Sequence, residues 1–319
     1  MNKTVYILVL LLAAFAAMAY AQRLNGIFAC PADEYTTTNY LAYCNAGDYG
    51  DYDRGAFWFS LKPEAVQAVI DADILFLGNS RLQFGLSSHT TADWFSRAGI
   101  RHYLLGFSHT ENISFLSPLL ERLRPRARAY VINVDHIFRT DLRAPTARLL
   151  TETDARARYQ SKRQSQTLHR FLCQFVPPLC GGAIAFYREP SIGHWTVTGH
   201  TDLTGSGIAD TPSGRQPDWD AQLDTAERFI TGLDIAPKCV LLTVVPSATT
   251  RRDEAEWLAE QLQLPLISPR LSGLRTFDGS HLDAISSEAW SRAFLQAAGQ
   301  SIKDCVEGPE SPVRLTGTT

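Results

Sequence analysis

Short apolar runs alternate with amphipathic stretches along most of this chain, and that rhythm limits the folds open to it. The runs occupy 74–78, 101–106, 129–134, 240–245 and 264–267, and helical patterns stand between them at 88–98, 112–123 and 253–262. Continuous rather than alternating hydrophobicity is typical of strands whose two faces are both covered. Such strands, separated by helices, predict a mostly parallel sheet between two helical layers. We therefore expect a three-layer α/β/α fold with a flavodoxin-like sheet.

The regular domain is expected to span 61–305. It opens with a short helix from Pro63 and closes with a helix over about 286–298. The rhythm breaks between about 137 and 218, where arginine-rich helical sequence gives way to a stretch rich in glycine, threonine and serine. A weakly patterned segment of this length predicts an insertion, either a functional lid over the site or a mobile surface excursion. The polar residues 306–319 predict a disordered tail.

The N-terminus has the layout of a secretory signal. Lys3 supplies a positive charge, an apolar run follows over 5–19, and small residues at Ala19 and Ala21 fit cleavage after Ala21. Residues 1–21 are therefore predicted to be a signal peptide, and the mature protein to be periplasmic or extracellular. An uncleaved anchor of about 17 residues is the alternative, because that length is at the short end of what spans a bilayer. That form would associate with the membrane through its N-terminal segment.

Six cysteines form an even set in a chain predicted to be exported, which favours disulfides. No C-x-x-C motif occurs, so the close thiolate spacing of zinc and thioredoxin-type sites is missing. Fifteen pairings are possible from sequence alone. Proximity suggests Cys30 with Cys44, Cys173 with Cys180, and Cys239 with Cys305.

Residues 22–60 are rich in Tyr, Asp, Asn and Gly and lack sustained periodicity, which predicts an irregular lead-in tied by a disulfide. The aromatic residues of this lead-in have two interpretations. They either stack on sugar rings or pack the lead-in onto the domain, and packing is the commoner use of such side chains.

The charge of the chain argues against one class of partner. It carries 30 basic and 33 acidic residues, a net charge of -3, and no basic block. Binding to a nucleic-acid backbone needs a concentrated positive surface, so no nucleic-acid partner is expected. A neutral or carbohydrate-like substrate is easier to accommodate.

The residues that point most strongly to chemistry lie far apart in the sequence. Ser80 follows an apolar run at the turn toward a helix, where open parallel sheets expose side chains to a ligand crevice. Asp278 and His281 stand before the last predicted helix. In a serine hydrolase the imidazole takes the hydroxyl proton, while the carboxylate orients the imidazole and stabilises its charged form. Each residue alone fits a helix cap or a surface turn, but the three together favour a catalytic triad.

The same residues carry a resemblance to a known family. Leu77-Gly78-Asn79-Ser80-Arg81 resembles the first block of the SGNH hydrolase superfamily, also called GDSL-like esterases, and Asp278-Gly279-Ser280-His281-Leu282 resembles its last block. The similarity covers most of 70–300 outside the insertion, and it points especially to exported branches that include polysaccharide O-acetyltransferases. The resemblance implies that Ser80 is the nucleophile, His281 the general base and Asp278 its orienting acid.

The middle blocks depart from that family's pattern. The second block offers a glycine N–H to the oxyanion, for which this sequence has Gly106 or the His109 position. The asparagine of the third block has no clean match, since Asn133 comes too early. One oxyanion donor is worth about 3 kcal/mol in the transition state, so we expect either a substitute donor or a slow enzyme. The candidate substitutes are Asn79, Asn112 and the Ser80 backbone N–H.

Three charged or titratable residues near these motifs have open roles. Arg81 is expected either to bind an anionic group of the substrate or to pair with a carboxylate, and the pair is favoured. Asp135 and His136 are expected either to line the crevice or to form a solvated loop turn, and the turn is favoured. The other histidines lack metal-ligand spacing, so neither a metal nor another cofactor is predicted.

These observations predict an exported ester hydrolase or O-acyltransferase with an acyl-Ser80 intermediate. The acyl group is expected to be acetyl, carried by a small molecule or by a cell-envelope polysaccharide. Hydrolysis and transfer share the intermediate and differ in whether water or a sugar hydroxyl attacks it. The alternative is a non-catalytic subunit that binds glycan or joins cell-envelope assembly partners, which the unmatched third block suggests.

Overall fold

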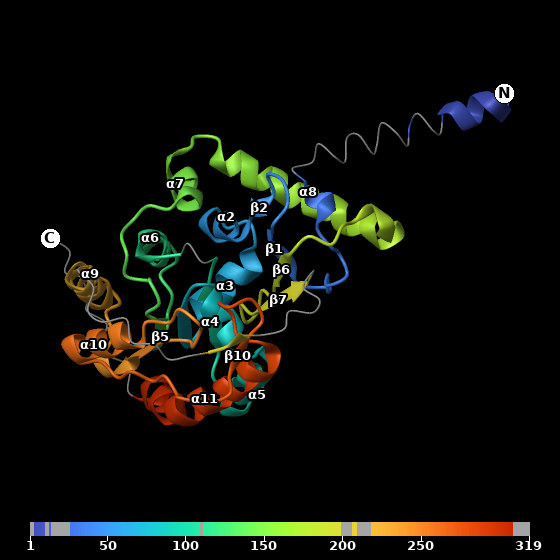
Figure 1. Ribbon diagram of the computed structural model, residues 1–319. Helices are drawn as coiled ribbons and strands as arrows, with labels where there is room; N and C mark the ends of the chain where they lie inside the picture. The colour runs from blue at the N-terminus through green and yellow to red at the C-terminus, as the bar shows by residue number, and fades with distance from the viewer. Residues whose placement is uncertain are drawn as a thin grey trace. The chain divides into compact units, whose positions relative to one another are not determined.

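The computed structural model describes residues 3–9, 13, 26–108, 111–198, 206–208 and 218–308. The chain, drawn in Figure 1, forms two compact units, each gathered from separate stretches of sequence. Unit 1 comprises Met1–Leu61, Arg148–Glu189 and Thr196–Thr201, and unit 2 comprises Lys62–Ala147, Pro190–Trp195 and Asp202–Thr319. Among the helices in these described ranges, none has the length and apolar character needed to cross a membrane.

Unit 2 is built on a four-stranded parallel sheet with the order β4-β3-β5-β9. The strands are β3 (Ile74–Gly78), β4 (His102–Gly106), β5 (Ala129–Asn133) and β9 (Val240–Thr243). All their residues are buried, as the continuous apolar runs predicted. The order, with the second strand outside the first, is that of flavodoxin-like sheets, so the predicted fold class is confirmed. The run 264–267 differs from expectation, because it adds only a single parallel bridge from Leu266 to Leu242.

One face of this sheet packs against α5 (Ser88–Ala98) and α11 (Ala284–Glu307), which lie beside each other in Figure 1. The ring of Phe76 in β3 contacts Phe95 of α5 and Phe294 of α11. The short helix η3 (Pro237–Cys239) is joined to α11 by the disulfide Cys239–Cys305. Helix α11 is longer than the expected 286–298 and reaches into the predicted tail, whose remaining residues 309–319 lie outside the described part.

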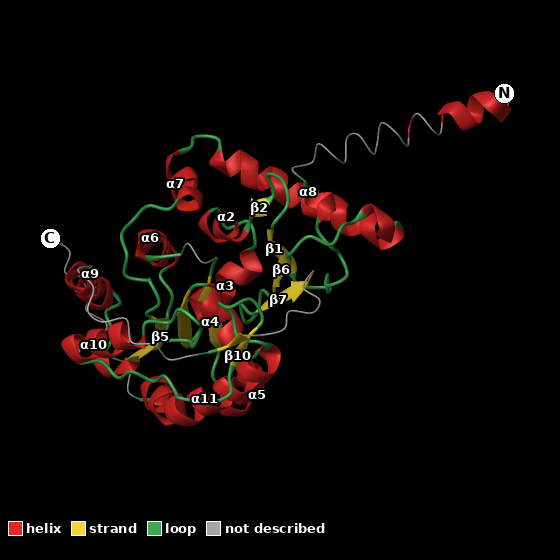
Figure 2. Ribbon diagram, viewed as in Figure 1, coloured by secondary structure: helices red, strands yellow, loops and turns green. Residues whose placement is uncertain are grey.

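The other face of the sheet is covered by α3 (Pro63–Asp71) and α6 (Ile113–Leu123), drawn in red in Figure 2. Because strand side chains alternate between faces, Leu75 and Leu77 of β3 point to this side. Two further helices, α9 (Trp219–Gly232) and α10 (Arg252–Leu262), pack together, and α10 contacts β9. The carboxyl ends of all four strands therefore remain available for a site at one edge of the sheet.

Unit 1 combines the lead-in with part of the expected insertion. Its sheet has the order β2-β1-β6-β7, with bounds β1 (Tyr40–Cys44), β2 (Gly50–Asp51), β6 (Ala185–Arg188) and β7 (Trp195–Thr198). β1 pairs antiparallel with both β2 and β6. The segment 22–60, expected to be irregular, thus supplies two strands as well as the helices η1 (Ile27–Ala29) and α2 (Asp53–Trp58). The insertion supplies α7 (Ala144–Thr151), α8 (Ala155–Phe175) and η2 (Pro177–Leu179).

A buried ion pair joins the two sequence segments of unit 1. Arg188 Nη2 in β6 lies 2.6 Å from Asp53 Oδ2 in α2, and both side chains are almost fully buried. Tyr40 OH donates a 2.6 Å hydrogen bond to the other oxygen of Asp53. Tyr49, Tyr52 and Phe57 are also fully buried, so packing rather than sugar stacking accounts for these aromatic side chains.

The three disulfides match the pairing that proximity suggested. Cys30–Cys44 and Cys173–Cys180 lie in unit 1, and Cys239–Cys305 lies in unit 2. All six cysteines fall in described residues, and none of them is free. Disulfides are typical of exported proteins, because oxidising compartments allow them to persist.

Candidate active site

Ser80 stands at the carboxyl edge of the parallel sheet, two residues after the end of β3 at Gly78. Asn79 follows the strand, has extended backbone angles and is the N-cap of α4 (Ser80–Gly85). Its side-chain oxygen accepts a hydrogen bond from Arg81 N–H at 3.0 Å. Gly78 leaves little room for a side chain, since a Cβ there would lie 3.0 Å from side-chain atoms of Asn133 and Leu82. This close turn presents the Ser80 hydroxyl beyond the end of the strand.

Asp278 and His281 lie in a tight loop between β10 (Arg275–Thr276) and α11. The loop is closed at its base by Phe277 N–H, which donates to the His281 carbonyl at 2.9 Å. Gly279 has φ of +82°, the left-handed region that glycine tolerates best. Asp278 Oδ1 accepts from the backbone N–H groups of Ser280 at 2.9 Å and His281 at 2.8 Å, which fixes the carboxylate within the loop.

The three predicted triad residues form one continuous chain of hydrogen-bonding atoms. His281 Nε2 lies 2.8 Å from Ser80 Oγ, and His281 Nδ1 lies 2.6 Å from Asp278 Oδ2. Ser80 is 3% exposed, whereas the Asp278 side chain is 30% exposed, so the chain runs from the interior to the surface. With the Nδ1 proton donated to Asp278, His281 Nε2 is free to accept the serine proton, which is the arrangement that serine nucleophiles require.

Asp278 is held in its charged form. Burial works to raise the pKa of this carboxyl, but the hydrogen bond and charge of His281 and the two backbone N–H donors outweigh it, and the pKa falls to about 2. The carboxylate is therefore ionised at every ordinary pH. It can orient the imidazole and stabilise the imidazolium that forms when His281 takes a proton.

Aromatic rings hold the imidazole on two sides. The ring of Phe277 is stacked on His281 at 5.5 Å between centroids, and the ring of Phe84 meets it edge-on at 4.9 Å. Phe84 and Phe277 also contact each other edge-on at 5.6 Å. This aromatic enclosure limits the rotation of His281 and keeps water from part of the Ser80–His281 contact. No sequence motif indicated the role of Phe84, although Phe277 directly precedes the Asp278 motif.

Arg81 and Asp135 frame the nucleophile from both sides. Asp135 Oδ1 accepts from Arg81 Nη1 at 2.9 Å, and Asp135 Oδ2 accepts from the amide of Asn79 at 3.0 Å. The neighbours of Ser80 on either side therefore bind the same buried carboxylate, which follows β5. Arg81 also donates from Nε to Ser280 Oγ at 3.1 Å and from Nη2 to Thr249 Oγ1 at 2.6 Å.

This network selects between the two roles considered for Arg81. The guanidinium pairs with a carboxylate, as the favoured interpretation held, and in addition connects the Ser80 turn to the loop that carries His281. Asp135 is part of the site's support rather than a solvated loop residue. His136 is partly exposed, has φ of +58°, and lies 3.7 Å from Asp135 Oδ1 through Nε2. Burial lowers the pKa of His136.

The two asparagines considered as oxyanion donors use their amides elsewhere. Asn79 Nδ2 donates to the carbonyl of Asp135 at 3.1 Å as well as to its carboxylate. Asn112 caps α6 with its side-chain oxygen, and its Nδ2 donates to the Asp141 carbonyl at 2.8 Å. Asn133, which the sequence placed too early, accepts from Val245 N–H at 3.2 Å and so ties β5 to the end of β9. These side chains support the turns around the site.

Backbone groups are the remaining candidates for an oxyanion site. Ser80 N–H belongs to the first turn of α4, and no oxygen of the described residues accepts a hydrogen bond from it. Gly106 ends β4 against the Ser80 turn, where a Cβ would lie 2.9 Å from the Asn79 carbonyl oxygen. Its glycine is thus needed for close packing of β4 on that turn. His109 lies outside the described residues.

A cluster of possible metal ligands occurs away from this site. His169, Cys173 and Cys180 lie together in unit 1, but Cys173 and Cys180 are joined as a disulfide. A disulfide offers no thiolate for a metal. His169 Nε2 also contacts the Cys30 carbonyl oxygen at 3.1 Å. The cluster is therefore accounted for by packing within unit 1.

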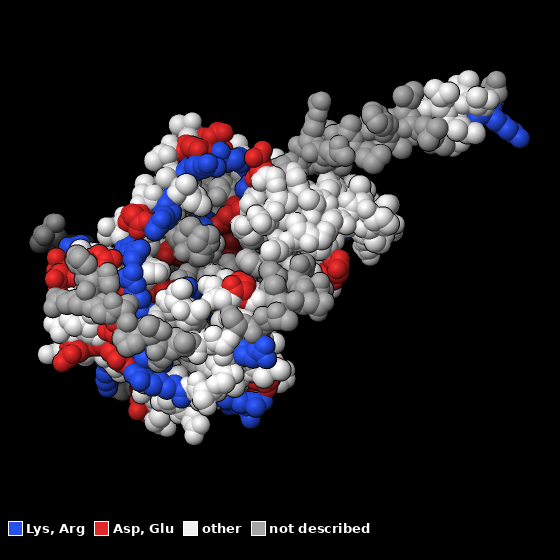
Figure 3. All heavy atoms as spheres, viewed as in Figure 1, with Lys and Arg blue, Asp and Glu red and all other residues white. Residues whose placement is uncertain are grey.

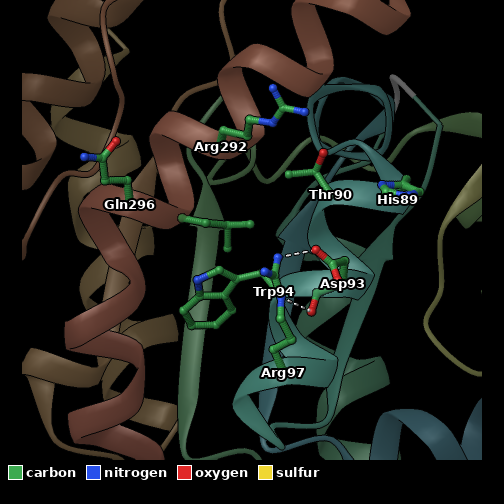
Figure 4. Close-up of a pocket in the computed structure, with 8 residues that line it drawn as sticks. His89, Thr90, Asp93, Trp94, Arg97, Arg292 and Gln296 are labelled. Carbon is green, nitrogen blue, oxygen red and sulfur yellow. Dashed lines mark hydrogen bonds and ion pairs between the residues drawn. The ribbon is translucent and has the colours of Figure 1, made fainter.

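Several hollows in unit 2 lie apart from Ser80. One of about 420 Å³ lies between α5 and α11, and Figure 4 shows Trp94 and the ion-paired Asp93 and Arg97 along it. Another of about 590 Å³ is lined by residues of α6 and α9. A third, of about 250 Å³, is lined by Ser247 and Thr250, on either side of Thr249. Since Thr249 binds Arg81, the third of these hollows adjoins the network described above.

Comparisons with known proteins found no relative of this chain. No protein-family model matches the chain, and neither a curated protein nor a solved structure matches it. The function is therefore inferred from the arrangement of the side chains themselves.

Proposed function

We propose that this protein is a serine-dependent enzyme that hydrolyses or transfers O-acyl groups, with acetyl as the acyl group. The observation that carries the proposal is the chain of contacts from Ser80 Oγ through His281 to Asp278, at 2.8 and 2.6 Å. Its position at the carboxyl edge of a flavodoxin-like sheet supports the same conclusion. The resemblance of the first and last motifs to SGNH hydrolases agrees with both.

The reaction follows from the protonation states of the site. His281 Nε2 removes the proton of Ser80 as Oγ attacks the ester carbonyl carbon, and the resulting imidazolium faces the charged Asp278. When the tetrahedral intermediate collapses, His281 returns the proton to the departing alcohol, which leaves an acyl-Ser80 ester. A water molecule or a sugar hydroxyl then attacks that ester, with His281 again as the base, and restores Ser80.

The oxyanion is assigned to backbone donors, with Ser80 N–H as the first. Backbone N–H groups act whatever the side chain, so this assignment tolerates the missing asparagine of the third block. With a single assigned donor the enzyme is expected to be slower than one with two, since each donor contributes about 3 kcal/mol.

The substrate is proposed to be an acylated glycan of the cell envelope or a small acyl donor outside the cytoplasm. Three disulfides and the predicted signal at 1–21 support export to the periplasm or beyond. N-terminal sequencing of the exported chain checks the cleavage expected after Ala21. A chain that still begins at Met1 would assign the apolar segment to membrane anchoring.

Replacement of Ser80 by alanine tests the chemistry. The chain from Gln22 onward retains every element from η1 to α11, and it should release p-nitrophenol from p-nitrophenyl acetate. Ser80→Ala should reduce kcat/KM by at least about a thousandfold, because the acyl intermediate can no longer form. Ser117→Ala, at a partly exposed position of α6 away from Ser80, is the matched control and should leave the rate unchanged.

Mass spectrometry distinguishes the candidate outcomes. Brief reaction with the acetate ester should add one acetyl group to the peptide that contains Ser80, and a sugar acceptor that speeds its loss more than water does would indicate transfer. Background rates and no acetyl adduct in both the original chain and Ser80→Ala would reject the enzyme proposal and favour the non-catalytic glycan-binding subunit.

A further inference from the structure

The C-terminal end of α8 carries an apolar surface that is unusual for a helix with so many charges. Phe171, Phe175 and Val176 are 58%, 66% and 50% exposed. The rings of Phe171 and Phe175, one turn apart, contact each other with centroids 5.0 Å apart. Single exposed apolar residues are ordinary on protein surfaces, whereas a contiguous aromatic pair with an adjacent valine forms a larger apolar patch. On the face shown in Figure 3, the end of α8 is drawn without charged residues.

The exposed face of α8 also carries positive charge. The helix contains five Lys or Arg residues and no Asp or Glu, although Lys162 is buried and Arg158 pairs with Glu152. Arg163 and Arg156 precede Phe171 by 8 and 15 residues, which places them on the same side of a helix as the apolar surface. Both arginines are exposed. Exposed arginine side chains on the same side as exposed phenylalanines complement a membrane surface that contains anionic lipid.

The first described element after the apolar run 5–19 packs against α8. Gly26 leads into η1, which packs on α8: the ring of Phe28 contacts His169 at 5.4 Å. Phe28 also accepts a hydrogen bond from Gly181 N–H at 2.9 Å, five residues after Val176. The described chain at Gly26–Ala29 therefore lies next to α8, the helix that ends in the apolar surface.

We propose that the end of α8, formed by Phe171, Phe175 and Val176 together with Arg163, binds the surface of a lipid bilayer that contains anionic lipid. The aromatic rings enter the interface between headgroups and acyl chains, and Arg163 lies over the phosphates. This contact orients unit 1 on the membrane whether the N-terminal segment is removed after export or retained as an anchor. It does not depend on the acyl-transfer proposal.

Vesicle sedimentation of the chain from Gln22 onward tests the proposal without the N-terminal segment. The protein should bind vesicles of phosphatidylcholine with phosphatidylglycerol. The double variant F171S/F175S should bind at least about tenfold more weakly, because each phenylalanine no longer leaves water. Arg163→Gln should lose about fivefold on these vesicles and nothing on phosphatidylcholine alone. The matched control L142S/I285S removes two side chains that are 51% and 82% exposed in unit 2 and should bind as the original does.

The full chain supplies the second measurement. With the N-terminal segment retained in vesicles, amide hydrogen exchange across 163–176 should slow relative to the vesicle-free protein, and F171S/F175S should abolish that protection. Folding of the variants is checked by circular dichroism and by p-nitrophenyl acetate hydrolysis. Equal vesicle binding by the original chain and F171S/F175S would overturn the proposal. So would a dimer that this double variant dissociates, since a second copy would then cover the surface.

Discussion

Arg81 reaches three different loops from a single side chain, and its role can be separated from substrate binding. Arg81→Lys keeps the charge but loses the planar fork that binds Asp135, Ser280 and Thr249 together. We expect kcat to fall by about tenfold to a hundredfold with little change in KM, because misplacement of His281 affects the chemical step. Steady-state kinetics on p-nitrophenyl acetate and on an anionic acyl ester checks this.

The matched control for that measurement is Arg101→Lys. Arg101 also binds a carboxylate, that of Asp73, through two nitrogens, but it lies at the other end of the strands. Its replacement should leave kcat unchanged. A raised KM for the anionic ester alone, with kcat retained in Arg81→Lys, would instead make Arg81 a substrate-binding group.

Asp278 should be required as a charge and not only as a hydrogen-bond acceptor. Its pKa of about 2 lies below that of an ordinary carboxyl, so its favourable contribution is complete above about pH 4 and is lost only as the pH falls toward 2. Asp278→Asn should therefore lower kcat by about a thousandfold or more at neutral pH, since the imidazolium loses its partner. Asp93→Asn, in an exposed ion pair, is the control and should retain full activity. Similar losses in both variants would point to misfolding.

The sequence predicted the candidate triad residues better than it predicted the side chains and contacts that surround them. Ser80, Asp278 and His281 could be found because each motif stands at a strand end or before a helix, where local sequence is informative. The contact between Arg81 and Asp135 spans 54 positions, and nothing local to either residue selects that partner. The side-chain amides of Asn79 and Asn112 are suitable oxyanion donors by residue type. In the structure they donate instead to Asp135 and to Asp141.

The loop between β10 and α11 acts as a rigid element, and Gly279 is the residue that permits it. A Cβ at φ of +82° is strained even where space is open, so Gly279→Ala should cost about 1–2 kcal/mol of stability. It should also lower kcat, because Asp278 and His281 share this loop. Gly273→Ala carries the same strain at φ of +78° in another loop and serves as control. Urea unfolding and kinetics on both variants test the expectation, which fails if kcat falls equally in the two.

Strands were predictable in unit 2 and missed in unit 1 for a physical reason. The buried strands β3, β4, β5 and β9 are covered on both faces, so their sequences are continuously apolar and stand out. β1 pairs with β6, and the pairing of Leu41 with Tyr187 joins residues far apart in sequence. β1 is held as a strand by β6, which lies outside the segment 22–60. Local periodicity therefore predicted the strands of unit 2 but not the strands that 22–60 contributes to unit 1.

The molecule as a whole should lose stability in mild acid because each unit contains a buried histidine. Burial lowers the pKa of His102 in unit 2 to about 4, and burial also lowers that of His169 in unit 1 to about 4. Between about pH 6.5 and 4 the unfolded chain binds protons at these positions and the folded chain does not. Stability therefore rises with pH across this window and falls as the pH drops, by about 2 kcal/mol per histidine at pH 5.

His102→Phe tests the unit 2 contribution. His102 stacks on Phe95 with ring centroids 4.4 Å apart, so a phenylalanine keeps a flat ring there without a titrating group. The difference in unfolding free energy between pH 7 and pH 5, measured by urea titration, should be smaller in this variant than in the original chain. His89→Phe, on the exposed side of α5, should retain the original difference. An unchanged acid dependence in His102→Phe would show that other groups cause it.

The pairing of the disulfides has a consequence for the proposed export, in which the chain would leave a membrane channel N-terminus first. Each cysteine bonds to the next one along the sequence: 30 with 44, 173 with 180, and 239 with 305. Sequential oxidation of the emerging thiols therefore yields the native bonds directly, with no wrong bond to be exchanged later. Biogenesis should accordingly need an oxidant but no disulfide isomerase, and loss of the isomerase from the host should leave the yield unchanged.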